Sequence, residues 1–148
     1  MSAAQGRSSG MAGRGFLLLA LGLPVLILVQ VYLAGLAIFS DGALWGAHGA
    51  VGGAIGVPII ALALMAWLSA PLHRHRMLTT LLFGLYILQF IFIIAGEGMG
   101  FMLALHPANA IAITVAAVLL ARAAWTARRS GAPHGAPGMH QAAASSAG

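Results

Sequence analysis

Four long apolar segments, separated by short polar connections, dominate the pattern of hydrophobic and polar positions along the chain. Each can cross a bilayer as a helix, because a helix rises about 1.5 Å per residue and the hydrocarbon layer is about 30 Å thick. The pattern therefore predicts four transmembrane helices, at about Gly15–Phe39, Leu44–Ala70, Met77–Gly96 and Phe101–Trp125.

The residues on either side of this region are small and polar. We expect residues 1–13 to be a disordered cytoplasmic leader and residues 126–148, which are rich in Gly, Ala, Pro and Ser, to be a disordered cytoplasmic tail. Residues 14–125 form the predicted transmembrane domain. Its first segment is too long for the hydrophobic region of a signal peptide, so we expect it to remain as an anchor.

The charges predict an orientation. Asp41 and Glu97 lie in the first and third connections, whereas every basic residue is an arginine on the opposite side of the predicted topology. By the positive-inside rule, both termini and the middle connection face the cytoplasm. Short connections also favour antiparallel neighbours, so we expect an all-α, up-and-down four-helix bundle in which the second and fourth helices share a diagonal. The arginines concerned are Arg7, Arg14, Arg74, Arg76, Arg122, Arg128 and Arg129.

The composition narrows the chemistry. Hydrophobic residues make up 61% of the chain and charged residues 6%, with a net charge of +5, so the main partner is the lipid bilayer and no nucleic-acid-binding face is expected. The absence of cysteine excludes disulfides, iron–sulfur clusters and covalently attached haem. The use of arginine without lysine, together with abundant Ala and Gly, indicates a GC-rich bacterial gene and hence a bacterial plasma membrane protein.

Five strongly polar side chains fall within the spans, where an unsatisfied polar group is costly. Their spacing repeats: nineteen residues separate His48 from Trp67 and His106 from Trp125. If both tryptophans lie in the inner aromatic belt, both histidines lie about 28 Å higher, near the outer face. The glutamines also match in depth, which predicts two helical hairpins related by a pseudo-twofold axis. The five residues are Gln30, His48, Gln89, His106 and Asn109.

Two histidines at one depth on diagonal helices can face each other across the bundle, which suits bis-histidine ligation of a haem iron. His48, Gly52 and Gly56 share one face of a helix, and glycine leaves room for a flat macrocycle. His106 is followed on its face by Asn109. The two glutamines can orient the imidazoles or contact the ring. We therefore predict non-covalent haem b, with His48 and His106 as ligands of the iron.

Each of these features also has a simpler explanation. The glycines form small-xxx-small patterns that serve helix packing, and the glutamines can be hydrogen-bonding groups between helices. His106 and Pro107 can begin a helix, since proline is tolerated in the first turn. His73 and His75 are expected to belong to a basic cytoplasmic loop.

Two resemblances concern residues 15–125. His48 and Gly52, Leu88-Gln89, and His106 resemble in order one four-helix half of haem A synthase, a family that holds b-type haem between such histidines. The stretches Gln30-Val-Tyr-Leu-Ala-Gly35 and Leu105-His-Pro-Ala-Asn109 are similar to an uncharacterised family of small four-helix bacterial membrane proteins. The chain departs from haem A synthase in having half the helices and Gly49 where Arg commonly follows the histidine, so oxidation of a haem methyl group is not expected.

Two hypotheses for function follow. In the first, the chain is a small b-type haem protein that transfers electrons, with a quinol or a periplasmic protein as redox partner. A homodimer would restore the eight helices of haem A synthase. In the second, it is a cofactor-free membrane subunit or assembly partner. The intramembrane carboxylates that a proton-coupled transporter uses are missing, and the sequence leaves open whether the protein is an enzyme.

Overall fold

The computed structural model describes residues 2–130, with side chains from Gly10 onward, and all regular secondary structure in this part of the chain is helical. Four of its helical stretches are long and apolar enough to cross a membrane, with mean hydropathies of 2.5, 2.2, 2.3 and 1.9 in chain order. The chain thus has the features of a multi-pass membrane protein with four spans. The helices are α1 (Ser2–Phe39), η1 (Gly42–Leu44), α2 (Trp45–Ala54), α3 (Gly56–Leu68), η2 (Ala70–His75), α4 (Arg76–Gly96) and α5 (Gly100–Ser130).

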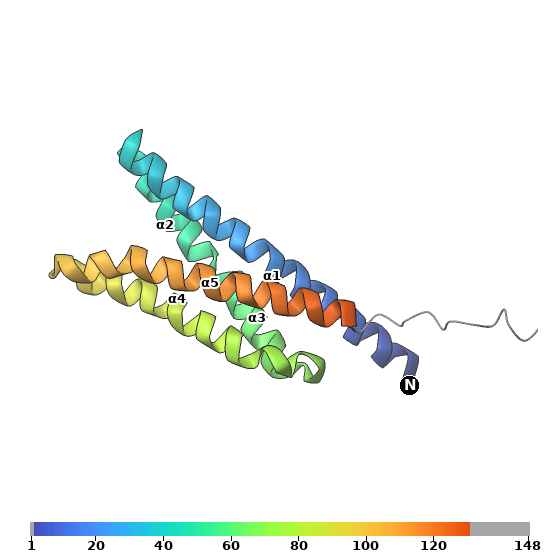
Figure 1. The fold of residues 1–148 in the computed structure, drawn as a ribbon. Helices are drawn as coiled ribbons and strands as arrows, with labels where there is room; N and C mark the ends of the chain where they lie inside the picture. The colour runs from blue at the N-terminus through green and yellow to red at the C-terminus, as the bar shows by residue number, and fades with distance from the viewer. Residues whose placement is uncertain (1, 131–148) are drawn as a thin grey trace, which may run out of the picture.

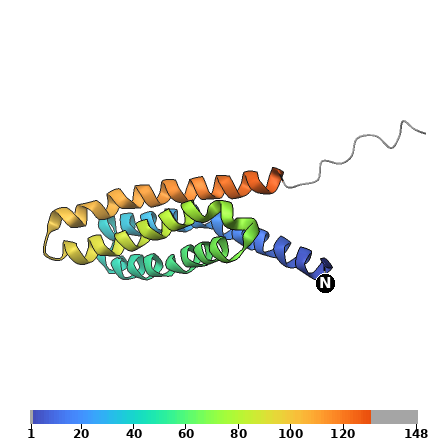
Figure 2. The ribbon, with the colours of Figure 1, turned by 90° about the horizontal axis from the view of Figure 1, so that it is seen from below.

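The observed bounds differ from several of the predicted ones. α1 begins at Ser2, ahead of the predicted span at Gly15, and its first turns project beyond the bundle (Figure 2). α5 extends to Ser130, into the predicted tail, and the rest of that tail lies outside the described residues. α5 also begins at Gly100, so Pro107 lies inside the helix and does not mark its start.

The second predicted helix is interrupted at Ile55, between α2 and α3. Pro58 lies in the first turn of α3, where a residue without an N–H group is tolerated, but it leaves the preceding turn without a hydrogen bond. The bond that follows the interruption, from the Ile59 N–H to the Ile55 carbonyl, is long at 3.4 Å. The chain thus breaks into two helices just before Pro58, whereas α1 continues through Pro24.

The four spans form an up-and-down bundle (Figures 1 and 2). Cα traces approach within 8 Å between α1 and α2–α3, between α3 and α4, between α4 and α5, and between α5 and α1. No such approach joins α1 to α4, or α2 or α3 to α5. The span α2–α3 and the span α5 therefore occupy one diagonal of the bundle, as predicted.

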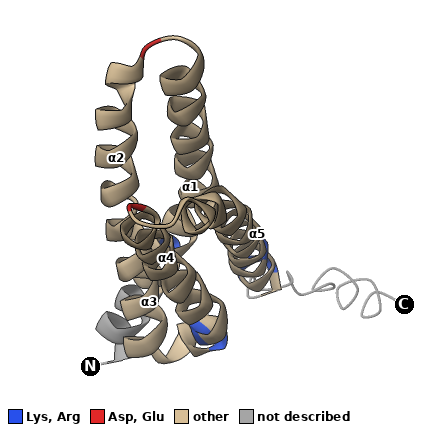
Figure 3. Ribbon diagram, turned by 90° about the vertical axis from the view of Figure 1, so that its left-hand side faces the viewer, with Lys and Arg blue, Asp and Glu red and all other residues tan. Residues whose placement is uncertain are grey.

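The two hairpins pack together at one end and diverge at the other (Figures 1 and 3). The hydrophobic core lies at the end where α3 turns into α4, and it includes Phe16, Leu23, Ile59, Leu62, Leu82 and Leu120. α2, by contrast, has no buried residue, and none of its Cα atoms lies within 8 Å of a Cα atom of α4 or α5. The connections at the tips of the two hairpins are held apart (Figure 3), and the candidate site lies on this open half.

Candidate functional site

His48 on α2 and His106 on α5 face each other between the diverging hairpins. Their ring centroids are 6.3 Å apart, and the ring planes meet at 62°. Both residues are partly buried. The two helices are not neighbours in the bundle, so this contact is made by the side chains across the diagonal.

The His48 ring is held by the neighbouring helix α1. Its Nδ1 lies 3.1 Å from the backbone carbonyl oxygen of Gln30, and the Gln30 side-chain amide donates to the His48 carbonyl at 2.8 Å. The Trp45 ring packs edge-on against the imidazole, with centroids 5.4 Å apart. With Nδ1 donating to a carbonyl, the free lone pair of the imidazole is on Nε2.

His106 is held in the same way by α4. Its Nδ1 lies 3.4 Å from the backbone carbonyl oxygen of Gln89, and the Gln89 amide donates to the His106 carbonyl at 3.0 Å. The backbone carbonyls of the two glutamines, and not their side chains, thus contact the imidazoles. The side-chain amides instead join the two helices of each hairpin. A sequence does not reveal a backbone acceptor, so this division of roles was not predictable.

The two hairpins differ in what satisfies the glutamine side-chain oxygen. Asn109 donates to the Leu85 carbonyl at 2.8 Å and to Gln89 Oε1 at 2.6 Å. On the other hairpin the residue with the same spacing from its histidine is Val51, which has no donor. Accordingly, Gln30 Oε1 is the one buried side-chain oxygen or nitrogen without a partner among the described side chains.

The predicted ligand-facing glycines accommodate protein side chains in this structure. A Cβ atom at Gly52 would lie 2.7 Å from Gln30 Nε2, and one at Gly56 would lie 2.6 Å from the Tyr86 hydroxyl oxygen. Real side chains essentially never show such distances, so a methyl group at either position would require the Gln30 amide or the Tyr86 ring to move. The Tyr86 hydroxyl lies 3.1 Å from the carbonyl oxygens of both Gly52 and Gly53, beside the interruption at Ile55. Tyr86 was not predicted as a site residue, because its partner is 34 residues away in sequence.

The remaining polar candidates lie away from the histidine pair. His73 is exposed on η2, whereas His75 is buried and stacks on Phe16 with centroids 5.0 Å apart. The Asp41 carboxylate accepts a hydrogen bond from the Ala43 N–H at 2.9 Å and so caps η1. Glu97 is exposed at the end of α4.

Charge is segregated along the bundle (Figure 3). Asp41 and Glu97 lie at the tips of the hairpins, on the side of the histidine pair, and the arginines lie at the other end. Both tryptophans used to estimate depth are at the arginine end. Arg76 lies over the Trp67 ring at 4.7 Å, and Arg129 lies over the Trp125 ring at 5.5 Å.

Comparison with protein families found one match, to a model described as a family of unknown function (DUF6220), over residues 30–96. This range is less than half of the chain, and it includes Gln30, His48 and Gln89 but ends before His106. The match agrees with the predicted resemblance to an uncharacterised family. Neither the curated proteins nor the solved structures gave a match, and no comparison supports a relationship to haem A synthase.

Proposed function

We propose that this chain is a small membrane-bound b-type haem protein that binds one haem between His48 and His106 and transfers electrons. The observation that carries the proposal is the 6.3 Å separation of the two imidazole centroids on opposite helices. Two imidazoles that share a metal ion, each bound through nitrogen at about 2.0–2.1 Å, have centroids roughly 6 Å apart. The pair therefore has the spacing of two axial ligands.

The hydrogen bonds around the pair favour the same role. Metal-binding histidines usually donate the N–H of the other ring nitrogen to a carbonyl or a carboxylate, which fixes the tautomer and the ring orientation. Here Nδ1 of His48 and Nδ1 of His106 each lie beside a glutamine carbonyl oxygen. Both Nε2 atoms keep a lone pair for a metal.

The donor set favours haem over a bare metal ion. Among the described residues, no group of three or more His, Cys, Asp or Glu side chains is placed to hold a metal. A pair of histidines alone leaves most coordination positions of a first-row metal open, whereas haem brings four equatorial nitrogens and needs only two axial ligands.

The half of the bundle that contains the histidine pair is packed less closely than the other half. α2 has no buried residue and contacts α4 and α5 through side chains only, whereas the opposite half of the same bundle has a close-packed core. The unpartnered Gln30 Oε1 lies on this half as well. α2 and α5 both begin at this end, and helix N-termini stabilise anions such as haem propionates. No arginine is needed there for this purpose.

We further propose that the two hairpins are a pseudo-twofold repeat and that the histidine end faces outward from a bacterial inner membrane. The matched bonds of Gln30 with His48 and of Gln89 with His106 support the repeat. The arginine-rich opposite end supports cytoplasmic termini, by the positive-inside rule. A quinol or a periplasmic protein is then the accessible redox partner.

Haem held by His48 and His106 would supply one-electron transfer. The chain's own contribution is positional. Two backbone carbonyls fix the imidazole rings, and Trp45 limits the movement of His48.

The alternative function is a cofactor-free subunit or assembly partner of a larger membrane complex. The observation that favours it is the packing around Gly52 and Gly56, whose free space is occupied by Gln30 and Tyr86. Under this alternative, the polar residues serve only to fix the helices relative to one another.

The deciding experiment is expression with a supply of haem, purification in mild detergent, and visible spectra of the oxidised and reduced protein. We expect a Soret band that shifts on reduction, with resolved α and β bands. His48→Ala and His106→Ala should each lose the low-spin spectrum, whereas His73→Ala, which changes an exposed loop histidine, should keep it. A colourless, folded wild-type protein would reject haem and favour the alternative. A low-spin spectrum that survives both substitutions would reject His48 and His106 as the ligands of the haem iron.

A further inference from the structure

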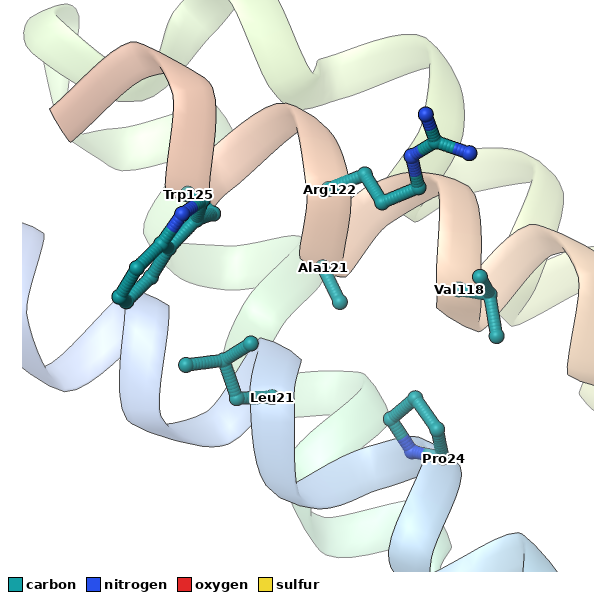
Figure 4. Close-up of a pocket in the computed structure, with 6 residues that line it drawn as sticks. All are labelled: Leu21, Pro24, Val118, Ala121, Arg122 and Trp125. Carbon is teal, nitrogen blue, oxygen red and sulfur yellow. The ribbon is translucent and has the colours of Figure 1, made fainter. Parts of the chain in front are cut away.

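A shallow apolar groove lies between α1 and α5 on the arginine half of the bundle (Figure 4). Its volume is about 420 Å³. Val118 is 12 residues after His106 on α5, which places the groove roughly 18 Å along the helix from the histidine pair. The groove therefore does not belong to the site proposed for haem. Its lining residues are Leu21, Pro24, Val118, Ala121, Arg122 and Trp125.

The groove exists because small or compact side chains line α1 and α5 at this level. Pro24 and Ala121 leave space between the helices, and Leu21 and Val118 are each 39% exposed on its walls. In a bilayer, these surfaces face lipid chains and not water. The shape and the apolar lining therefore suit one acyl chain lying along the helices.

Trp125 lies at one end of the groove, and Arg122 leaves α5 beside it with its guanidinium directed away from α1 (Figure 4). Arg122 is exposed and forms no side-chain hydrogen bond or ion pair within the described part of the chain. Trp125, 45% exposed, stands beside it with Arg129 over its ring. Tryptophan is enriched at the depth of lipid headgroups, and arginine side chains extend from the apolar layer to that depth.

The protein itself supplies no acid to balance these arginines. The whole sequence contains two acidic residues, Asp41 and Glu97, and both lie at the opposite end of the bundle (Figure 3). A second copy of the chain would bring further arginines to the same level. Residues 131–148 contain no acidic side chain either. An anionic partner for Arg122 is therefore not supplied by the acidic side chains of this chain.

We propose that the groove is a binding site for an anionic phospholipid of the leaflet at the arginine end. One acyl chain lies along Leu21, Pro24 and Val118, and the negative headgroup lies at Arg122. Basic pockets between transmembrane helices bind anionic headgroups by the same chemistry. A zwitterionic lipid fills the apolar groove equally well but does not neutralise Arg122, so selectivity for charge is the signature of the site.

The test is native mass spectrometry of the full-length protein in detergent with equal amounts of phosphatidylglycerol and phosphatidylcholine of identical chains. One arginine near the headgroup level favours the anionic lipid by about fivefold. We expect that preference in the wild type and its loss in Arg122→Gln. Arg74→Gln removes an exposed arginine from η2 at the same end of the bundle and should retain it.

A second pair of variants tests the apolar part without changing charge. Val118→Phe fills the groove and should reduce the occupancy of both lipids, whereas Val115→Phe, at an exposed α5 position outside the groove, should not. Equal binding of the two lipids by the wild type overturns the proposal. An equal loss of anionic preference in Arg122→Gln and Arg74→Gln also overturns it, because it would indicate diffuse surface charge. Equal lipid occupancies in Val118→Phe and Val115→Phe overturn it as well. None of these outcomes depends on haem.

Discussion

Asn109 donates its side-chain amide to Gln89 Oε1 at 2.6 Å and to the Leu85 carbonyl at 2.8 Å, and so joins α5 to two turns of α4. Asn109 is 7% exposed and lies one turn from His106. The other hairpin has Val51 at the matching position, and there the glutamine oxygen has no partner. The two hairpins therefore differ at this position beside the candidate site.

Asn109→Val should destabilise the protein. The substitution leaves Gln89 Oε1 without a donor in a place that water reaches poorly, and it removes the second hydrogen bond of the Leu85 carbonyl, which keeps its bond within α4. A cost of about 1–3 kcal/mol is expected for a buried group that loses its partner. Thermal unfolding in detergent, followed by circular dichroism, measures the loss as a lower Tm. An unchanged Tm would mean that Asn109 does not hold α5 to α4.

Val51→Asn is the reverse change on the other hairpin. An amide at this position can donate to Gln30 Oε1, which otherwise lacks a partner. Because one buried acceptor becomes satisfied, we expect the Tm to rise or to stay within a degree or two, in contrast to the fall in Asn109→Val. A comparable fall in both variants would show that the two hairpins do not use equivalent positions.

Gly56→Ala should disrupt the contact between α3 and α4. The added methyl group would lie 2.6 Å from the Tyr86 hydroxyl oxygen and 3.1 Å from two ring atoms, so the ring must move and lose its hydrogen bonds to the Gly52 and Gly53 carbonyls. We expect a loss of about 1–3 kcal/mol, as is typical of overpacking, measured as a lower Tm in detergent.

Two further variants test that explanation. Gly49→Ala adds a methyl group where no atom lies within 4 Å, so its Tm should remain close to that of the wild type. Tyr86→Phe removes the nearest clashing atom, and the double variant with Gly56→Ala should therefore lose less stability than the sum of the single losses. Strict additivity would argue against a direct contact as the cause.

The sequence predicted the spans because each depends on a long apolar run, and α4 at Arg76–Gly96 begins within one residue of its predicted start. The sequence also indicated that His48 and His106 are paired, because their equal depth in the membrane follows from the number of residues between each histidine and its tryptophan. The break at Ile55 was not located, because a proline can kink a helix without ending it. The roles of Tyr86 and of the glutamine carbonyls depend on contacts between helices, which a single sequence does not show.

Arg76→Ala should weaken the end of α3. The Arg76 side chain donates to the Ala66 carbonyl at 3.3 Å and to the Trp67 carbonyl at 3.0 Å, and it also covers the Trp67 ring. It thus satisfies carbonyls that a helix end leaves unpaired. We expect a loss of about 1–2 kcal/mol, measured by thermal unfolding. Arg74 is an exposed neighbour without these bonds, so Arg74→Ala should leave the Tm unchanged. Equal Tm changes in the two variants would indicate that the loss of a charge, and not the loss of the helix cap, is the cause.

Gln89→Leu should weaken the proposed haem site without abolishing it. The substitution removes the amide bond to the His106 carbonyl and the acceptor for Asn109, but it keeps the backbone carbonyl beside His106 Nδ1. Because the ligand itself remains, the low-spin spectrum should persist, while haem affinity falls about 10-fold or more as the ring becomes less well oriented. Haem titration of the apoprotein measures this change, with Thr126→Val on the far half of α5 as the control. Complete loss of the spectrum would show that Gln89 acts on the fold and not on ligand orientation.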